Sequence, residues 1–216
     1  MQFDIITIFP KAFGYLEQSI IGRAIKAGKV KVKIHDLRKW TVDLHRTVDD
    51  RPYGGGPGMV MKVEPLFKAI KAIKKKKKAK VILFAAKGEN FTQAKAKKWK
   101  SLSQIILVPG HYEGIDERIL KWVDEEISIG DYVLTGGELP AMIVIDAVSR
   151  LIPGVLGKDE SSTDESHWTP GWLEYPHYTR PDAFQNLKVP KDLLSGDHKK
   201  ILIWREKHAK KRVNKK

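Results

Sequence analysis

Three short glycine-bearing segments have the composition to hold a small ligand with their main chain. They are residues 85–88 (AAKG), 110–114 (GHYEG) and 128–137 (SIGDYVLTGG), and each follows an apolar stretch. Glycine has no Cβ, so a ligand can approach its backbone closely. In an open parallel sheet, ligands bind beyond the carboxyl ends of the strands, where such loops meet. We therefore expect one shared ligand site, although any one segment taken alone could equally be a turn.

The rest of the sequence limits the chemistry of such a site. It contains no GxxxxGK[ST] phosphate loop and no GxGxxG motif after an expected strand, so nucleoside triphosphates and dinucleotides lose their usual support. No Ser, His and Asp set has nucleophile-elbow spacing. The chain also lacks cysteine, which excludes disulfides, thiolate catalysis and cysteine-bound zinc. Carboxylates, arginines and backbone dipoles remain, and a metal held by carboxylates stays open.

The distribution of charge favours RNA as a partner. The formal net charge is +14, from 40 Lys and Arg against 26 Asp and Glu. Residues 71–80 contain seven lysines and no acid, and residues 198–216 contain nine basic residues and one glutamate, which leaves −1 for everything else. A near-neutral body with two basic patches suits a polyanion held at the periphery. The lysine run alone could be a solvated surface, but the two patches together indicate RNA.

Short apolar strands alternate with helices around the glycine-bearing segments. Strands are predicted at residues 3–9, 30–35, 81–86 and 105–108, and residues 36–58 form a long loop. Helices are predicted from about 10 to 26, over 64–73, after a capping Thr92, from near Asp116, and after a capping Asp197. This order is typical of an α/β fold with a largely parallel sheet.

One predicted helix, residues 139–150, has almost no polar face. A helix that is apolar all round must be covered on every side. It is either a central core helix or partly covered by another subunit, and both interpretations stay open. The chain start lacks a basic leader, and no apolar run approaches the ~20 residues of a membrane helix. We therefore expect a cytoplasmic protein with no membrane partner.

Four longer strings in collinear order make a family resemblance. They are DDRPYGGGPGMVM (residues 49–61), GHYEGIDER (110–118), SIGDYVLTGGELPAMIVIDAVSRLIPGVLG (128–157) and PHYTRP (176–181). These strings closely resemble the bacterial TrmD family, the tRNA (guanine-N1)-methyltransferases. The match runs from Phe3 to about Trp204, which is far more specific than a lone glycine pattern.

The resemblance implies a SPOUT-type α/β domain with a C-terminal trefoil knot over residues 1–160. It also implies an interdomain linker over 161–180 and a short basic helical tRNA-binding extension over 181–216. The enzyme would be a homodimer with the active site at the subunit interface, and the substrate would be tRNA, methylated on the guanosine immediately 3′ of the anticodon. S-adenosylmethionine would be the methyl donor, held by Ala85, Ala86, Gly88, Gly110, Tyr112, Glu113, Gly114, Ser128, Ile129, Gly130, Asp131, Tyr132, Val133, Leu134, Gly136, Gly137 and Pro140.

The resemblance also suggests the catalytic groups. N1 of guanine carries a proton, so methyl transfer needs a base for that proton and a cation to stabilise charge on O6. By register the base is Glu165, with Asp164 in reserve because this chain has Glu before Ser166 where the family usually has Asp. Arg150 is the expected cation, and Glu113 is expected to assist at the donor or at a bound magnesium ion.

Two departures and three alternatives accompany this reading. The family commonly has arginine where His111 stands. Its C-terminal domain is also normally longer than the single helix expected here. We therefore expect residues 71–80 and the basic tail to contribute more to tRNA binding. A SPOUT methyltransferase on another RNA and a non-catalytic RNA-binding protein remain alternatives. A metal-dependent hydrolase would use Asp49, Asp50, Asp116 and Glu117, but no histidine spacing supports it.

Overall fold

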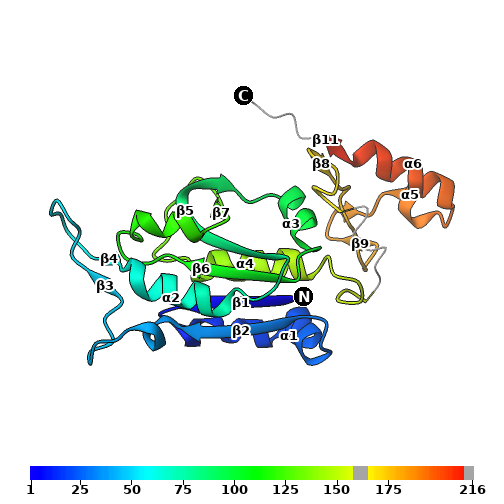
Figure 1. Cartoon of the computed structure of the whole chain (residues 1–216). Helices are drawn as coiled ribbons and strands as arrows, with labels where there is room; N and C mark the ends of the chain where they lie inside the picture. The colour runs from blue at the N-terminus through cyan, green and yellow to red at the C-terminus, as the bar shows by residue number, and fades with distance from the viewer. Residues whose placement is uncertain (158–164, 212–216) are drawn as a thin grey trace. The chain divides into compact units, whose positions relative to one another are not determined.

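The computed structural model describes residues 1–157 and 165–211. The chain divides into two compact units, Met1–Asp159 and Glu160–Lys216. At the centre of the first unit is a five-stranded sheet in the order β2-β1-β6-β5-β7 (Figure 1), and every strand pair in it is parallel. The predicted α/β class with a parallel sheet is therefore confirmed. Its strands are β1 (Gln2–Thr7), β2 (Lys31–Asp36), β5 (Ala79–Asn90), β6 (Gln104–Pro109) and β7 (Glu125–Ser128).

Burial along the strands follows their place in the sheet. All six residues of β6 are buried, as are the last five of β1, because both strands are covered on both faces. In the edge strand β2 no residue is buried, and half of the residues are exposed. Asp4 of β1 is nonetheless buried, and its carboxylate lies 2.8 Å from His35 Nε2 and accepts a 2.6 Å hydrogen bond from Gln104 Nε2. This polar cluster joins β2, β1 and β6.

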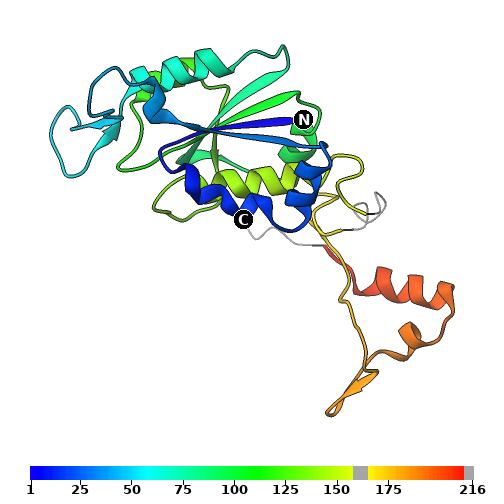
Figure 2. The same cartoon turned by 90° about the horizontal axis from the view of Figure 1, so that it is seen from below.

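Helices cover both faces of the sheet. Figure 2 shows α2 on one face and α4 with η1 and α1 on the other. The α helices of this unit are α1 (Ser19–Lys26), α2 (Val63–Ile73), α3 (Gln93–Trp99) and α4 (Glu138–Ser149), and the 3₁₀ helices are η1 (Pro10–Glu17), η2 (Leu37–Trp40) and η3 (Glu117–Trp122). The side chain of Thr92 caps α3 by accepting from the Lys95 N–H, as its sequence predicts. Within residues 1–157 and 165–211, no helix combines the length and apolar composition needed to cross a membrane.

Three sequence predictions of local structure are corrected. The helix expected from residue 10 to 26 is two helices, because Gln18 is extended and Ser19 has a φ of 55°. The helix expected near Asp116 is the short 3₁₀ helix η3, capped by the Asp116 side chain. The long loop contains η2 and the two-residue strand β3 (Asp49–Asp50), which pairs antiparallel with β4 (Val60–Met61). Of the three, the pairing of β3 with β4 joins residues about ten positions apart, which local propensity does not reveal.

The second unit is built around Trp204. Its helices are α5 (Lys191–Leu194) and α6 (His198–His208), and its short strands are β8 (Trp172–Leu173), β9 (Ala183–Phe184), β10 (Leu187–Lys188) and β11 (Lys210–Lys211). Asp197 caps α6, as predicted, by accepting from the Lys199 and Lys200 N–H groups. Trp204 is buried, stacks on His208 at 4.1 Å, and meets Tyr175 and Tyr178 edge-on. Aromatic residues of the predicted linker thus pack on the basic helix.

Candidate functional site

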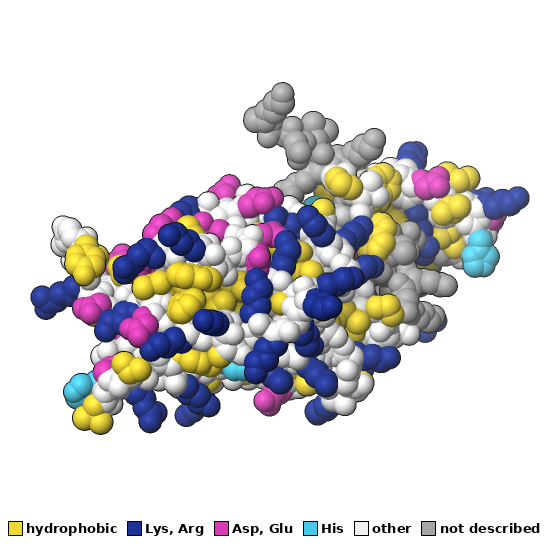
Figure 3. Space-filling model, viewed as in Figure 1, with side chains coloured by type: hydrophobic (Ala, Val, Ile, Leu, Met, Phe, Trp, Pro, Cys, Tyr) yellow, Lys and Arg dark blue, Asp and Glu magenta, His cyan; other side chains and the backbone are white. Residues whose placement is uncertain are grey.

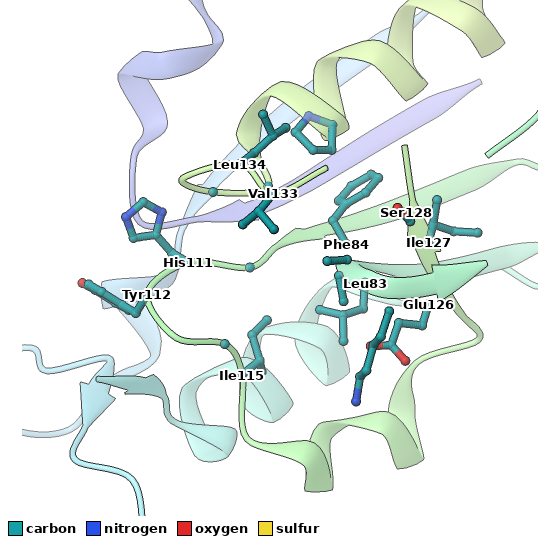
Figure 4. A pocket seen from close by; sticks show the side chains of 18 of the residues that line it. Leu83, Phe84, His111, Tyr112, Ile115, Glu126, Ile127, Ser128, Val133 and Leu134 are labelled. Atoms are coloured by element: carbon teal, nitrogen blue, oxygen red, sulfur yellow. The ribbon is translucent and has the colours of Figure 1, made fainter. Parts of the chain in front are cut away.

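The carboxyl ends of β6 and β7, together with residues 83–87 of β5, border a cavity of about 490 Å³ in the first unit. All three glycine-bearing segments contribute to its wall. Figure 4 shows the segment that carries His111 and Tyr112 on one side and Leu83, Phe84 and Ile127 of the sheet on the other. The expected meeting of three loops at one edge of a parallel sheet therefore occurs.

The first segment is a bulge within a strand. We expected the strand to end at Ala86, but β5 continues to Asn90. Phe84 and Glu89 are both opposite Ile127 of β7, so residues 85–88 leave the register, and residues 85–87 form part of the cavity wall. Gly88 holds the bulge against β7, because a Cβ there would lie 2.6 Å from the Ile127 nitrogen.

The second and third segments are joined to each other by their backbones. The Gly137 N–H donates a 2.7 Å hydrogen bond to the Gly110 carbonyl, and His111 bridges to Gly136. A Cβ on Gly137 would lie 2.6 Å from Pro109 Cα and 2.7 Å from the Gly110 nitrogen. Only glycine permits this approach, which places the amino end of α4 directly against the end of β6.

The glycine-rich end of the long loop supports the second segment from outside. The Glu113 N–H donates to the Met59 carbonyl at 3.0 Å, and the Met61 N–H donates to the Gly114 carbonyl at 3.0 Å. Gly58 has a φ of 79°, and a Cβ there would lie 2.4 Å from Glu113 Cγ. Gly58 and Met59, at the end of the GGGPG segment, therefore hold the side chain and the backbone of Glu113.

Charged side chains line one part of the cavity. Lys87 Nζ donates to both carboxylate oxygens of Glu117, at 2.7 and 2.8 Å, and lies 3.8 Å from Glu126. The hydrogen bonds that Lys87 donates to Glu117, together with the negative charge of Glu126, raise the pKa of Lys87 above its ordinary value. This exposed ion pair connects the β5 bulge to η3 across the wall of the cavity.

His111 is packed at the base of the second segment. Its ring meets Phe9 and Tyr112 edge-on, each at 4.9 Å between ring centroids. Its Nδ1 is buried, makes no hydrogen bond among the described residues and lies 3.9 Å from Glu138, which accepts a 2.9 Å hydrogen bond from Thr7. Burial raises the pKa of the Tyr112 phenol, and the charge of Asp49 adds to this shift.

Most residues predicted to hold the donor line this cavity. Gly88, Gly130 and Asp131 are the exceptions: Gly88 packs on β7, and Gly130 is held by Ser128, whose hydroxyl donates to its carbonyl at 2.9 Å. The predicted residues in the wall are Ala85, Ala86, Gly110, Tyr112, Glu113, Gly114, Ser128, Ile129, Tyr132, Val133, Leu134, Gly136, Gly137 and Pro140.

Sequence reasoning missed the lining residues outside the glycine-bearing segments. The apolar ones include Leu83, Ile115 and Leu120, and the charged ones include Glu117 and Glu126. The apolar spacing in residues 115–120 was a usable signal, because the inward side of η3 forms that wall. The charged pairing was not readable, since Lys87 and Glu117 are 30 positions apart.

The predicted catalytic residues are placed differently from one another. Glu113 lines the cavity, whereas Arg150 follows α4 and lines a separate space of about 100 Å³ with Asp146 and Tyr15. Glu165 is half-buried in the second unit, and Asp164 lies outside the described residues. In the described parts of the chain, no three acids or histidines converge as metal ligands, and Asp116 is instead bound to Arg118 at 2.6 Å.

Comparison with known proteins identifies the family. The family model described as tRNA (Guanine-1)-methyltransferase TrmD matches residues 1–216. A tRNA (guanine-N(1)-)-methyltransferase of Heliobacterium modesticaldum is 51% identical over 221 residues, which cover 99% of this chain and 82% of that protein. Proteins with the same name from Chloroflexus aggregans and Dictyoglomus turgidum are 54% and 51% identical, over 99% of this chain and 84% and 86% of their own lengths. This chain therefore belongs to the TrmD family of tRNA (guanine-1)-methyltransferases.

Proposed function

We propose that this protein transfers a methyl group from S-adenosylmethionine to N1 of the guanosine immediately 3′ of the anticodon in tRNA. The observation that carries the proposal is the cavity of about 490 Å³ lined by the segments that resemble the family's donor-binding loops. Family membership supports the reaction class and the tRNA substrate. A methyltransferase of this family uses S-adenosylmethionine, which supplies an electrophilic methyl group on a positively charged sulfur.

The cavity has the properties that this donor requires. Its volume lies within the range of about 300–1,000 Å³ that is usual for small-molecule sites. Leu83, Phe84 and Ile127 offer an apolar surface for a planar base, and the backbone of residues 110–114 offers donors and acceptors to polar groups. Acidic side chains in the wall, Glu113 and Glu126 among them, favour a cationic ligand.

The acceptor chemistry assigns roles to Glu165 and Arg150. Glu165 would take the N1 proton of guanine, with Asp164 as the alternative, and the Arg150 guanidinium would stabilise the negative charge that develops on O6. Glu113 would position the donor, alone or with a bound magnesium ion. These roles come to the matching residues from the family resemblance.

The position of Arg150 favours a homodimer with a shared active site. Pro140, near the amino end of α4, lines the cavity, whereas Arg150 directly follows the other end of this 12-residue helix. At about 1.5 Å per residue, the ends of such a helix are roughly 18 Å apart. Arg150 thus follows the end of α4 that is remote from the cavity of its own subunit, which supports the proposal that a second copy supplies it.

Exposed apolar groups support the same proposal. Ile143 and Leu139 of α4 are 45% and 58% exposed in the single chain, and Val133 beside the cavity is 86% exposed. Large apolar groups gathered on one surface are typical of an interface. The sequence left open whether a second subunit covers part of the apolar helix α4, and we favour that interpretation.

The remaining family features complete the proposal. The first unit would be a SPOUT domain over residues 1–160 with its trefoil knot formed around the donor loops, and the protein would act in the cytoplasm. Residues 161–180 would be the linker that carries the base, and residues 181–216 would bind tRNA. The basic helix α6, with Lys199, Lys200 and Arg205, supplies charge suited to a phosphate backbone.

The decisive experiment uses unmodified tRNA and labelled S-adenosylmethionine, followed by mapping of the methylated nucleoside. We expect N1-methylguanosine at the position 3′ of the anticodon, and no label in a tRNA with adenosine at that position. Methyl transfer to a different nucleotide would indicate a methyltransferase with another RNA target. tRNA binding without any transfer under single-turnover conditions would indicate a non-catalytic RNA-binding protein.

A further inference from the structure

The lysine-rich segment lies on the edge of the sheet opposite the cavity. Lys31 of β2 is paired with Gln2 of β1, Gln2 with Gln104 of β6, and Gln104 with Ala79 of β5, so these four residues form one row across the amino ends of the strands. Residues 74–78 immediately precede this row. The cavity lies toward the other ends of the strands, against residues 83–87 of β5 and beyond the carboxyl ends of β6 and β7.

Other lysines reach the same edge from separate elements. Lys29 and Lys31 stand at the start of β2, and Lys98 and Lys100 lie at the end of α3, which leads into β6. On the face drawn in Figure 3, Lys and Arg side chains gather around the end of the sheet where Figure 1 marks the amino terminus. We call this set the lysine edge. Its members are all exposed: Lys29, Lys31, Lys75, Lys76, Lys77, Lys78, Lys98 and Lys100.

The acids described near the lysine edge are already engaged by other basic side chains. Asp124 is paired with Lys74 at 2.8 Å, and Glu125 is paired with Lys80 and Lys95. Asp4 is buried with His35. Among the described residues, no member of the lysine edge forms an ion pair within 4.0 Å, so their charges remain available to a ligand.

The lysine edge is also held in place, unlike a loosely solvated run. The Lys78 carbonyl accepts hydrogen bonds from the backbone N–H and the hydroxyl of Ser103, both at 3.1 Å, and the Lys76 N–H donates to Gln104 Oε1 at 3.4 Å. Burial and the positive charge of Lys100 both lower the pKa of Lys97. Like charges are thus concentrated on a fixed backbone.

We propose that the lysine edge binds the phosphate backbone of the tRNA whose guanosine is methylated at the opposite edge; this rests on the proposed function. Strands lie about 4.8 Å apart, so the row from β2 to β5 is about 14 Å wide, enough for several phosphates. From Ala79 to Ala85 the strand advances about 20 Å. The lysine edge therefore binds a part of the tRNA that is remote from the reacting nucleotide. It contributes to the affinity for tRNA but not to the methyl-transfer step.

The test combines Lys31→Gln, Lys78→Gln and Lys100→Gln in one variant, which removes a charge from three elements of the edge. Each phosphate contact contributes about 0.7–0.9 to the slope of log affinity against log salt, so the slope should fall by about 2. The KM for tRNA should rise roughly tenfold at moderate salt, while kcat at saturating tRNA and the KM for S-adenosylmethionine stay at their wild-type values. The matched control carries arginine at the same three positions and should retain the wild-type slope and KM.

An unchanged slope and KM in the glutamine variant would overturn the proposal. So would an equal loss in the arginine variant, which would mean that charge is not what the edge contributes. A fall in kcat at saturating tRNA would also overturn it, because the edge would then act on the chemical step. Binding is measured by titration of unmodified tRNA without turnover. The protein could bind RNA with an affinity that depends on the lysine edge and yet fail to methylate tRNA. That result would refute the proposed function but not the proposal that the lysine edge binds RNA.

Discussion

The contact between Gly137 and the end of β6 is a close backbone contact that shapes the cavity, and Gly137→Ala tests it. The added Cβ would meet Pro109 Cα at 2.6 Å and the Gly110 nitrogen at 2.7 Å, where ordinary contacts begin at 3.4 Å. Both neighbours are backbone atoms and cannot rotate away. The two loops must therefore separate by about 0.8 Å, which strains the 2.7 Å hydrogen bond between them.

Overpacking of this kind costs about 1–3 kcal/mol. For a chain of this size each kcal/mol lowers Tm by about 2–4 °C, so a cost of about 2 kcal/mol predicts a decrease of roughly 4–8 °C. If S-adenosylmethionine binds only when the two loops are in close contact, its binding must bring the loops together again and must overcome the same strain energy. Because about 1.4 kcal/mol corresponds to a tenfold change, the Kd for S-adenosylmethionine should rise about 30-fold.

Calorimetric titration with S-adenosylmethionine and a thermal melt measure the two quantities on the same preparation. Gly14→Ala is the matched control, because a Cβ at Gly14 of η1 has no atom within 4 Å and its backbone is not left-handed. The control should bind and melt like the wild type. Wild-type affinity and Tm in Gly137→Ala would refute the reasoning, since the loops would then not depend on their close approach.

Three further predictions concern stability, assembly and catalysis. Burial raises the pKa of Asp4, but its hydrogen bonds outweigh burial and lower it, so ionised Asp4 stabilises the fold above its unfolded pKa and loses this effect as pH falls through the lowered value. Asp4→Asn should therefore lower the free energy of unfolding in urea by about 2 kcal/mol at pH 7, and should reduce the dependence of stability on pH below about pH 4. An unchanged pH dependence in this range would contradict the prediction. Ile143→Asp should raise the dissociation constant of a dimer at least 100-fold in sedimentation, because a buried unpaired charge costs about 3–5 kcal/mol. The control Val42→Asp, at a side chain that is 82% exposed, should assemble normally. A fully dimeric Ile143→Asp protein would exclude this face as the interface. Glu165→Gln should lower kcat by about 100-fold or more with tRNA affinity retained, and Asp164→Asn should stay active; the reverse pattern would make Asp164 the base.

Much of the local structure was readable from the sequence because it depends on neighbouring residues. The capping side chains of Thr92 and Asp197 begin helices where predicted. The uninterrupted apolar run of β6 is buried on both faces, as a central parallel strand must be. Glycine placement located the wall of the cavity, since close backbone approach and glycine occur together.

The sequence by itself therefore determined the α/β class, the caps, the glycine-bearing segments and the family, because each depends on a local pattern or a collinear motif. Only the tertiary structure decided that β5 resumes pairing after residues 85–88, that Lys87 meets Glu117 across the cavity wall, and that Arg150 lies at the far end of α4 from the cavity. It alone also placed lysines from three elements on one edge of the sheet. These features depend on strand register and on contacts between residues that are distant in the chain. The packing of the whole unit determines both, and local propensity does not encode them.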